Sequence, residues 1–157
     1  MDLLDDTFFM REAIKEARKA FDEDEVPVGC VIVKDRKIIA RSFNQVERLK
    51  DPTAHAEILA ITQATSLLKS KFLEDCVLYV TLEPCLMCAG AMILARIKKL
   101  VFSAQDPKAG AVISKVNIND LGLNHRIELK KGLLEEECAQ ILRAFFEKKR
   151  IRLSTNN

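Results

Sequence analysis

The stretches DPTAHAEI (residues 51–58) and YVTLEPCLMCAGAM (residues 79–92) decide the fold that this sequence predicts. In the first, Thr53 is expected to cap the start of a helix, because Ser, Thr, Asp and Asn are favoured at that position. In the second, a β-rich apolar run is followed by Pro84, which suits the first position of a helix. Each stretch therefore predicts a helix that begins beside chemically reactive side chains.

Helices and strands alternate along the rest of the chain, as shown by apolar residues at helical or strand spacing. Helices are expected at 6–21, 53–68, 85–97 and 133–150, and strands at 28–33, 37–43, 77–82, 100–103 and 125–129. No repeat, linker or low-complexity tract separates them. The chain, residues 1–157, is therefore predicted to form a single α/β domain with one sheet sandwiched between helices.

His55, Glu57, Cys85 and Cys88 form a set of reactive side chains within the two stretches. One imidazole and two thiolates suit Zn²⁺, and three protein ligands leave its fourth position open for water. Cys85 and Cys88 are three residues apart and share one helical face. His55 and Glu57 are two residues apart, which suits different roles. The pattern predicts a catalytic zinc site with His55, Cys85 and Cys88 as ligands and Glu57 as a proton shuttle.

A Cys-x-x-Cys pair also occurs in redox-active dithiols and in closed structural zinc sites. A redox dithiol needs no His-x-Glu block upstream. A structural zinc site needs a fourth ligand, for which the remaining sulfur and imidazole groups are Cys30, Cys76, Cys138 and His125, none of them at paired spacing with another. Their apolar neighbours predict instead that the three remaining cysteines are buried thiols.

Composition indicates a globular protein. Of the 157 residues, 48% are hydrophobic and 31% are charged, which is ordinary for a folded domain. The sequence shows no basic and apolar leader and no apolar run long enough to cross a membrane. Five cysteines, an odd number, fit a reducing compartment better than a disulfide framework. We therefore expect a cytoplasmic protein that has no membrane partner.

Charge is distributed unevenly, although the net charge is only +2. Residues 1–25 carry nine acidic and four basic side chains, whereas residues 143–157 carry five basic side chains and one acidic. A basic terminal helix can bind phosphates or simply expose a solvated face. Charge alone favours the solvated face.

The pattern H-x-E…P-C-x-x-C is the signature of zinc-dependent nucleobase deaminases. Other blocks extend the similarity beyond the two stretches: VPVG at 26–29, RI at 96–97, DPKAGA at 106–111 and NHRIE at 124–128. In this order and without insertions, the blocks resemble those of the bacterial tRNA-specific adenosine deaminases. The resemblance covers residues 7–150.

The resemblance implies hydrolytic deamination of adenosine to inosine at the wobble position of a tRNA anticodon, with the anticodon loop as partner. It implies a homodimer with one Zn²⁺ per subunit and the cytidine-deaminase-like fold, a three-layer α-β-α sandwich whose central mixed sheet carries helices on both faces. Asn44 matches the family's base-contacting Asn, Val28 an apolar wall of the pocket, and Asp106 a residue near the neighbouring nucleotide's sugar.

Each of these residues also has a purely structural interpretation. Asn44 would cap a turn, Val28 would belong to the core, and Asp106 before a proline would open a loop. Phe145 and Phe146 suit stacking on an unpaired base, but on an amphipathic terminal helix they are more often core residues.

Two other function classes remain open at this point. A small-molecule nucleobase deaminase acting on free guanine or cytosine would share the His-x-Glu and Cys-x-x-Cys blocks. A catalytically silent zinc-binding partner subunit is expected to lack the shuttle carboxylate, and Glu57 is present. Activity on a free base in the absence of RNA would favour the small-molecule enzyme.

Overall fold

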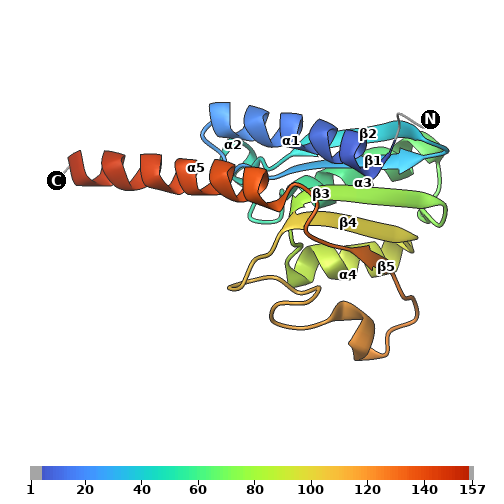
Figure 1. Cartoon of the computed structure of the whole chain (residues 1–157). Coiled ribbons are helices and arrows are strands. Elements are labelled where there is room, and N and C mark those ends of the chain that lie inside the picture. The colour runs from blue at the N-terminus through green and yellow to red at the C-terminus, as the bar shows by residue number, and fades with distance from the viewer. Residues whose placement is uncertain (1–4, 156–157) are drawn as a thin grey trace.

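The computed structural model describes residues 5–155 and forms a five-stranded sheet with helices on both faces (Figure 1). The helices are α1 (Asp6–Asp22), α2 (Val46–Leu49), α3 (Ala56–Leu68), α4 (Leu86–Ala95), the 3₁₀ helix η1 (Ile118–Leu121) and α5 (Glu135–Thr155). The strands are β1 (Gly29–Lys34), β2 (Lys37–Phe43), β3 (Cys76–Leu82), β4 (Lys99–Ala104) and β5 (Glu128–Lys130).

The sheet is mixed, with the strand order β2-β1-β3-β4-β5. Strand β1 runs antiparallel to both β2 and β3, whereas β4 runs parallel to β3 and β5. Parallel neighbours need a crossover, and α4 provides it between β3 and β4. Helix α4 therefore starts at the carboxyl end of β3, on the face of the sheet that it shares with α3 (Figure 1).

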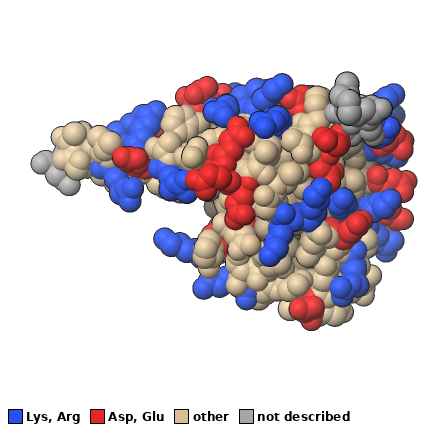
Figure 2. Space-filling view, in the orientation of Figure 1, with Lys and Arg blue, Asp and Glu red and all other residues tan. Residues whose placement is uncertain are grey.

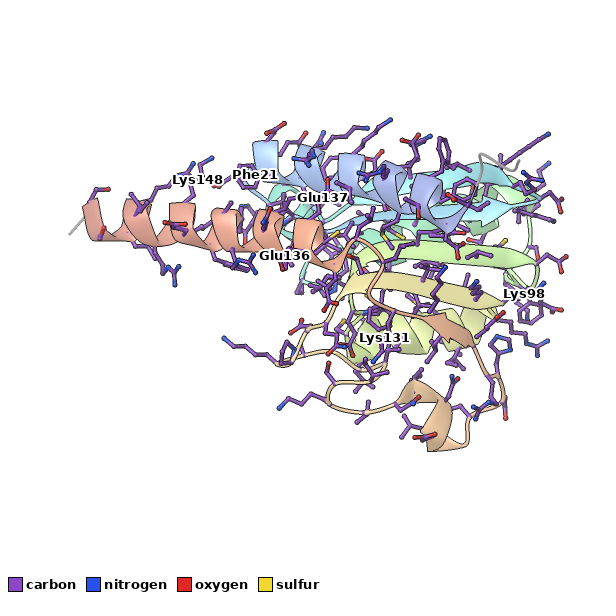
Figure 3. All side chains as sticks on the ribbon, viewed as in Figure 1. Phe21, Lys98, Lys131, Glu136, Glu137 and Lys148 are labelled. Atoms are coloured by element: carbon purple, nitrogen blue, oxygen red, sulfur yellow. The ribbon has the colours of Figure 1, made fainter. Side chains whose placement is uncertain are left out.

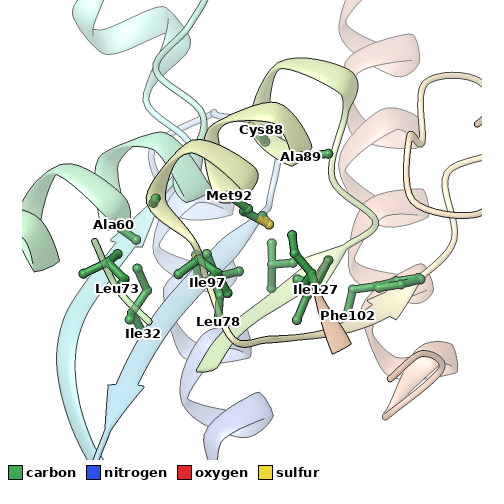
Figure 4. Close-up of a cluster of buried hydrophobic side chains, with 14 of the residues drawn as sticks. Ile32, Ala60, Leu73, Leu78, Cys88, Ala89, Met92, Ile97, Phe102 and Ile127 are labelled. Atoms are coloured by element: carbon green, nitrogen blue, oxygen red, sulfur yellow. The ribbon is translucent and has the colours of Figure 1, made fainter. Parts of the chain in front are cut away.

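Alternating side chains of the strands supply two hydrophobic cores, one on each face of the sheet. On β3, Leu78 and Val80 join a core with α3 and α4, while Tyr79 between them joins a core with α1 and α5. Figure 4 shows the first of these cores, in which Met92 of α4 and Phe102 of β4 are fully buried. These two cores confirm the predicted three-layer α-β-α sandwich.

Gly29 lets α1 lie directly against the start of β1. A Cβ atom at this position would come within 2.0 Å of the Ala13 carbonyl oxygen and 2.4 Å of the Ala17 nitrogen. The Gly29 amide also donates a hydrogen bond to Thr81 Oγ1 on the neighbouring strand, at 3.1 Å. Any larger residue would displace the helix from the sheet. This close approach fixes the beginning of β1, immediately after Val28.

Two of the predicted helix starts were wrong. Helix α3 begins at Ala56 with His55 at the N-cap position, and α4 begins at Leu86 with Cys85 at the N-cap position. Thr53 instead lies in a turn, where its amide and hydroxyl both donate to Asp51 Oδ1. An N-cap residue has a non-helical backbone, and His55 and Cys85 are both extended here. The shift therefore places two candidate ligands, His55 and Cys85, at the N-cap positions of the two helices.

The acidic and basic ends of the chain pair with each other where α1 and α5 lie side by side (Figure 3). Asp24 of the acidic end pairs with two residues of the basic end, Arg152 at 2.9 Å and Lys149 at 3.9 Å. Nearer the start of α5, the polarity is reversed, because Glu137 accepts from Arg11 and Arg18 of α1 at 3.3 Å each. Lys and Arg side chains still dominate the part of α5 that projects from the body (Figure 2). Among the helices of residues 5–155, none is long and apolar enough to cross a membrane.

Candidate active site

The candidate ligands meet where α3 and α4 begin, on the same face of the sheet. The Nδ1 atom of His55 lies 3.6 Å from the Cys85 sulfur and 3.5 Å from the Cys88 sulfur. A tetrahedral Zn²⁺ with Zn–N of about 2.05 Å and Zn–S of about 2.3 Å requires an N···S separation of about 3.6 Å. All three donor atoms lie within 4.8 Å of one another. Their chemistry and spacing fit Zn²⁺.

The pKa values in this group favour a thiolate beside an imidazolium. Hydrogen bonds from Cys88 and then His55 lower the pKa of Cys85 to about 4, against the opposing effect of burial. The same contact with Cys85 raises the pKa of His55. The imidazole also forms a hydrogen bond with the backbone of Pro52, which orients the ring as such partners do in metal sites. The hydrogen bond to Cys85 and burial instead raise the pKa of Cys88. Only Cys85 is therefore prepared as a thiolate, and a bound cation would displace the protons that Cys88 and His55 retain.

Glu57 is the second residue of α3 and lies beside the ligand group without belonging to it. Its side chain is buried, with the residue only 4% exposed. Burial raises the pKa of this carboxyl to about 7, and a hydrogen bond from its own backbone amide only partly offsets that effect. A carboxyl group with a pKa near neutrality can both accept and donate a proton under physiological conditions.

A cavity of about 370 Å³ opens over this group. Besides the ligand group, its walls come from the β1 start, the β2–α3 connection, the β3–α4 turn, the loop after β4 and helix α5. The cavity-lining residues include six of the seven predicted site residues: Val28, Asn44, His55, Glu57, Cys85 and Asp106. The seventh, Cys88, is buried next to them in α4.

Asn44 presents an unused carboxamide to the cavity. Its backbone amide donates to the Val28 carbonyl oxygen at 3.0 Å, and the residue is 8% exposed. Among the described residues 5–155, no hydrogen bond to its side chain is present, and the N-cap of α2 is the next residue, Gln45. The arrangement does not support the capping interpretation. A polar group of this kind in a pocket is available for a ligand.

Val28 and Asp106 combine structural and cavity-facing positions. Val28 is 9% exposed and belongs to the core shared with α3 and α4, yet it also lines the cavity. The Asp106 carboxylate accepts hydrogen bonds from the amides of Lys108 and Ala109, at 3.1 Å each. It therefore shapes the start of its loop, as the structural interpretation expected, while lying at the rim of the cavity.

Glu83 is a site residue that no sequence pattern indicated. Its carboxylate is buried and accepts five hydrogen bonds from one loop, donated by the amides of Asp106, Val112, Ile113 and Ser114 and by the Ser114 hydroxyl. Gly110 lies so close that an added Cβ would come within 2.3 Å of the carboxylate carbon. Glu83 thereby holds the 106–114 loop against the turn that carries Cys85.

Both aromatic residues of α5 line the cavity, but only one of them is buried. Phe145 is 2% exposed and stacks edge-on against Phe21 of α1, while Phe146 is 48% exposed at the cavity mouth. Phe145 is thus a core residue. His125 lies away from the ligand group, where its Nε2 contacts the Ile97 carbonyl oxygen at 2.6 Å. His125 therefore does not supply a fourth ligand to this group.

Comparison with known proteins identifies the family of this chain. A tRNA-specific adenosine deaminase from Aquifex aeolicus is 52% identical, with 91% of this chain and 95% of that protein covered. The tRNA-specific adenosine deaminase from Bacillus subtilis is 48% identical over 92% of this chain and 91% of its own length. The chain belongs to the tRNA-specific adenosine deaminase family. A profile described as MafB19-like deaminase also matches residues 4–150.

Solved structures place the family within a wider group of deaminases. A structure from work on A-to-I editing by tRNA:A34 deaminases superposes with a TM-score of 0.85 at 49% identity, covering 87% of this chain and 99% of that one. A guanine deaminase from Nitrosomonas europaea gives a TM-score of 0.79 at 25% identity, covering 92% and 86%. The tRNA-specific adenosine deaminase family thus shares its fold with enzymes acting on a free base.

Proposed function

We propose that this protein hydrolyses adenosine to inosine and ammonia at the wobble position of a tRNA anticodon. The observation that carries the proposal is the lining of one cavity by His55, Cys85, Glu57 and Asn44. The family supports RNA rather than a free base as substrate, because the tRNA-specific relatives match more of this chain at higher identity than the guanine deaminase from Bacillus subtilis does, at 41% over 64% of this chain.

His55, Cys85 and Cys88 would hold Zn²⁺, one ion per chain. When bound, the ion supplies activation of a water at its open fourth position, by lowering the pKa of that water toward neutrality. Glu57 accepts a proton from the water and delivers it to adenine N1, so that C6 becomes open to attack. Glu57 then takes the remaining proton from the oxygen now bonded to C6 and passes it to the departing amine. Water is consumed, ammonia leaves, and a keto oxygen remains on C6.

Asn44 and Val28 suit the recognition of a purine in this cavity. The Asn44 carboxamide offers donors and an acceptor to polar atoms of the base, and Val28 offers an apolar surface for its ring. An anticodon loop is an accessible source of such a base, because its nucleotides are already unpaired and cost little to extrude. Phe146 at the cavity mouth is placed for stacking against a neighbouring base.

Incubation of the purified protein with total tRNA, followed by sequencing for inosine, tests the proposal. We expect A-to-I conversion at position 34 of one or more tRNAs. Free guanine, free cytosine and adenosine serve as parallel substrates. Ammonia release from guanine without any inosine in tRNA would replace the proposal with the free-base alternative, which the structural likeness to guanine deaminase supports.

We further propose that the protein is a homodimer that uses the outer face of α4. Leu86 is 61% exposed and Leu94 is 80% exposed on this short helix. They border an apolar hollow that also contains Phe72 and Leu123. A contiguous apolar surface of this kind is typical of an interface. Sedimentation at micromolar concentration should give twice the chain mass, and a monomer would contradict the proposal.

A further inference from the structure

We infer that Glu25 is a positioning residue that fixes the cavity wall carrying Asn44 and thereby sets the affinity for the target base. The inference rests on the proposed function, since it concerns the substrate of the same site. Glu25 belongs to neither the ligand group nor the proton shuttle. It lies after the end of α1, and it is 1% exposed.

Both oxygens of the Glu25 carboxylate are used by a different part of the chain. Oε1 accepts from the Glu47 amide at 2.9 Å, and Oε2 accepts from the Arg48 amide at 2.7 Å. The two donors are consecutive residues of α2, 22 and 23 positions further along the chain. Hydrogen bonds to an ionised acceptor are shorter and stronger than neutral ones. Glu25 therefore connects α2 firmly to the segment that follows α1.

Helix α2 has little else to hold it in place. It spans four residues, and none of them is buried. It also forms an ion pair with the same segment, between Arg48 and Glu23 at 3.4 Å, whose side chains are 60% and 44% exposed. Exposed ion pairs contribute little. Within residues 5–155, the buried carboxylate is thus the principal anchor of this helix.

The position of α2 matters because it lies between two site residues. The connection from β2 to α3 begins with Asn44 and ends with His55, and its two ends are joined by a hydrogen bond from the Gln45 amide to the Ala54 carbonyl oxygen, at 3.0 Å. Asn44 has no side-chain hydrogen bond within the described chain, so its backbone alone directs the carboxamide into the cavity. Loosening α2 would therefore let this wall move.

The variant Glu25→Gln weakens the contact between position 25 and α2 without changing the size of the side chain. Its carbonyl oxygen can replace one acceptor, but its NH₂ group then faces the second backbone N–H, donor against donor. In Glu25→Gln we expect the amide hydrogens of Glu47 and Arg48 to exchange roughly tenfold faster, the scale of one missing charge-assisted hydrogen bond. Glu23→Gln is the matched control, because that carboxylate is exposed and, within residues 5–155, pairs only with the Arg48 side chain.

The functional measurement uses an anticodon stem-loop RNA with adenosine at the wobble position. In Glu25→Gln we expect KM to rise about tenfold, kcat to stay within about threefold and zinc to remain stoichiometric, because only binding of the base is weakened. The Glu23→Gln control should match the wild type in all three quantities.

A second pair of variants tests the same contact from the other side and does not depend on how Glu25→Gln folds. Glu47→Pro deletes one donor N–H at a position in the first turn, where proline is tolerated. Glu47→Ala removes the same side chain but keeps the N–H, so the difference between the two reports the hydrogen bond. We expect the KM effects of Glu25→Gln and Glu47→Pro to be non-additive, since both remove one interaction.

Three outcomes would overturn the inference. Unchanged amide exchange in Glu25→Gln would show that the carboxylate does not hold α2. Faster exchange with an unchanged KM would show that the wall does not govern base affinity. Loss of zinc would mean that the effect runs through His55. Failure of the wild type to form inosine would instead reject the proposed function, and the exchange measurement would still decide whether Glu25 anchors the wall.

Discussion

Glu57 and Glu83 are two glutamates beside the ligand group that are both almost inaccessible to solvent, yet their hydrogen-bond partners differ completely. Each is two residues from a candidate ligand, and they are 4% and 2% exposed. Glu83 accepts five hydrogen bonds from the 106–114 loop, which outweigh burial and lower the pKa of its carboxyl. Glu57 has no comparable set of donors, so burial prevails and the pKa of its carboxyl rises to about 7.

The difference separates a carboxylate that maintains structure from one that can exchange protons. A buried charge is tolerated when donors surround it, and such a group has no capacity left for chemistry. A buried carboxyl with few donors is costly to keep ionised, and such a group is a candidate for function. Burial alone therefore does not identify the proton shuttle here. The number of donors around each carboxylate does.

The largest expected effect comes from the ligands that adjoin both glutamates. Cys85→Ala or Cys88→Ala should abolish zinc binding and deamination together, because two protein ligands cannot hold the ion. Metal analysis of the purified variants and an inosine assay measure the two effects. Full zinc occupancy in either variant would mean that the ligands lie elsewhere.

Glu57→Gln tests the shuttle directly. We expect a rate loss of about 10²-fold or more, the scale of a removed acid-base group. Zinc should remain stoichiometric, and thermal stability should equal or exceed that of the wild type, since the change removes a buried ionisable group with few partners. Near-normal turnover of the zinc-loaded variant would reject the role of Glu57 and the distinction drawn from it.

Glu83→Gln should give the opposite pattern. The carboxamide cannot accept all five hydrogen bonds, so we expect unfolding free energy to fall by about 2–4 kcal/mol. Denaturant unfolding of the two glutamine variants side by side measures the contrast. If Glu57→Gln proved the less stable of the two, the assignment of structural and chemical roles would be reversed.

The sequence predicted those parts of the molecule that depend on local pattern. The β-rich apolar run at 77–82 predicted strand β3, and the spacing of Cys85 and Cys88 indicated a shared ligand group. The starts of α3 and α4 were misplaced because His55 and Cys85 themselves occupy the N-cap positions. Capping preferences favour Thr over His or Cys at that position, and the site overrides them.

Long-range hydrogen bonds explain most of the features that the sequence did not predict. Glu25 and Glu83 bind backbone amides more than 20 positions away, and backbone donors leave no trace in residue type. Strand β5 begins later than predicted because Asn119, rather than a neighbouring strand, binds the Ile127 backbone on both its amide and its carbonyl. Helix α2 is too short to show an apolar period.

Residues remote from both glutamates should affect binding alone. Neutralising Lys148, Lys149 and Arg150 together is expected to weaken tRNA binding and to make its salt dependence shallower, by up to about one slope unit for each RNA phosphate that the variant no longer neutralises. Zinc content and turnover at saturating substrate should change little. Unchanged affinity and slope would show that α5 exposes only a solvated face and that the RNA follows another path.

The smallest effect is expected at Asp6, whose carboxylate is more exposed than those of Glu57 and Glu83, with 24% of its side chain accessible to solvent. Burial alone would raise the pKa of this carboxyl. Hydrogen bonds from Lys130 at 2.8 Å and Tyr79 at 2.6 Å, together with the charge of Lys99, outweigh that effect, so the pKa lies below its ordinary value. Such a group stabilises the fold above its unfolded-state pKa, and this contribution is lost as pH falls through the lowered folded-state pKa. Asp6→Asn should therefore cost about 1 kcal/mol or less at neutral pH, and its difference from the wild type should vanish in acid. Denaturant unfolding at neutral pH and again below pH ~3 measures both values, and a difference that persists in acid would mean that Asp6 acts through packing rather than charge.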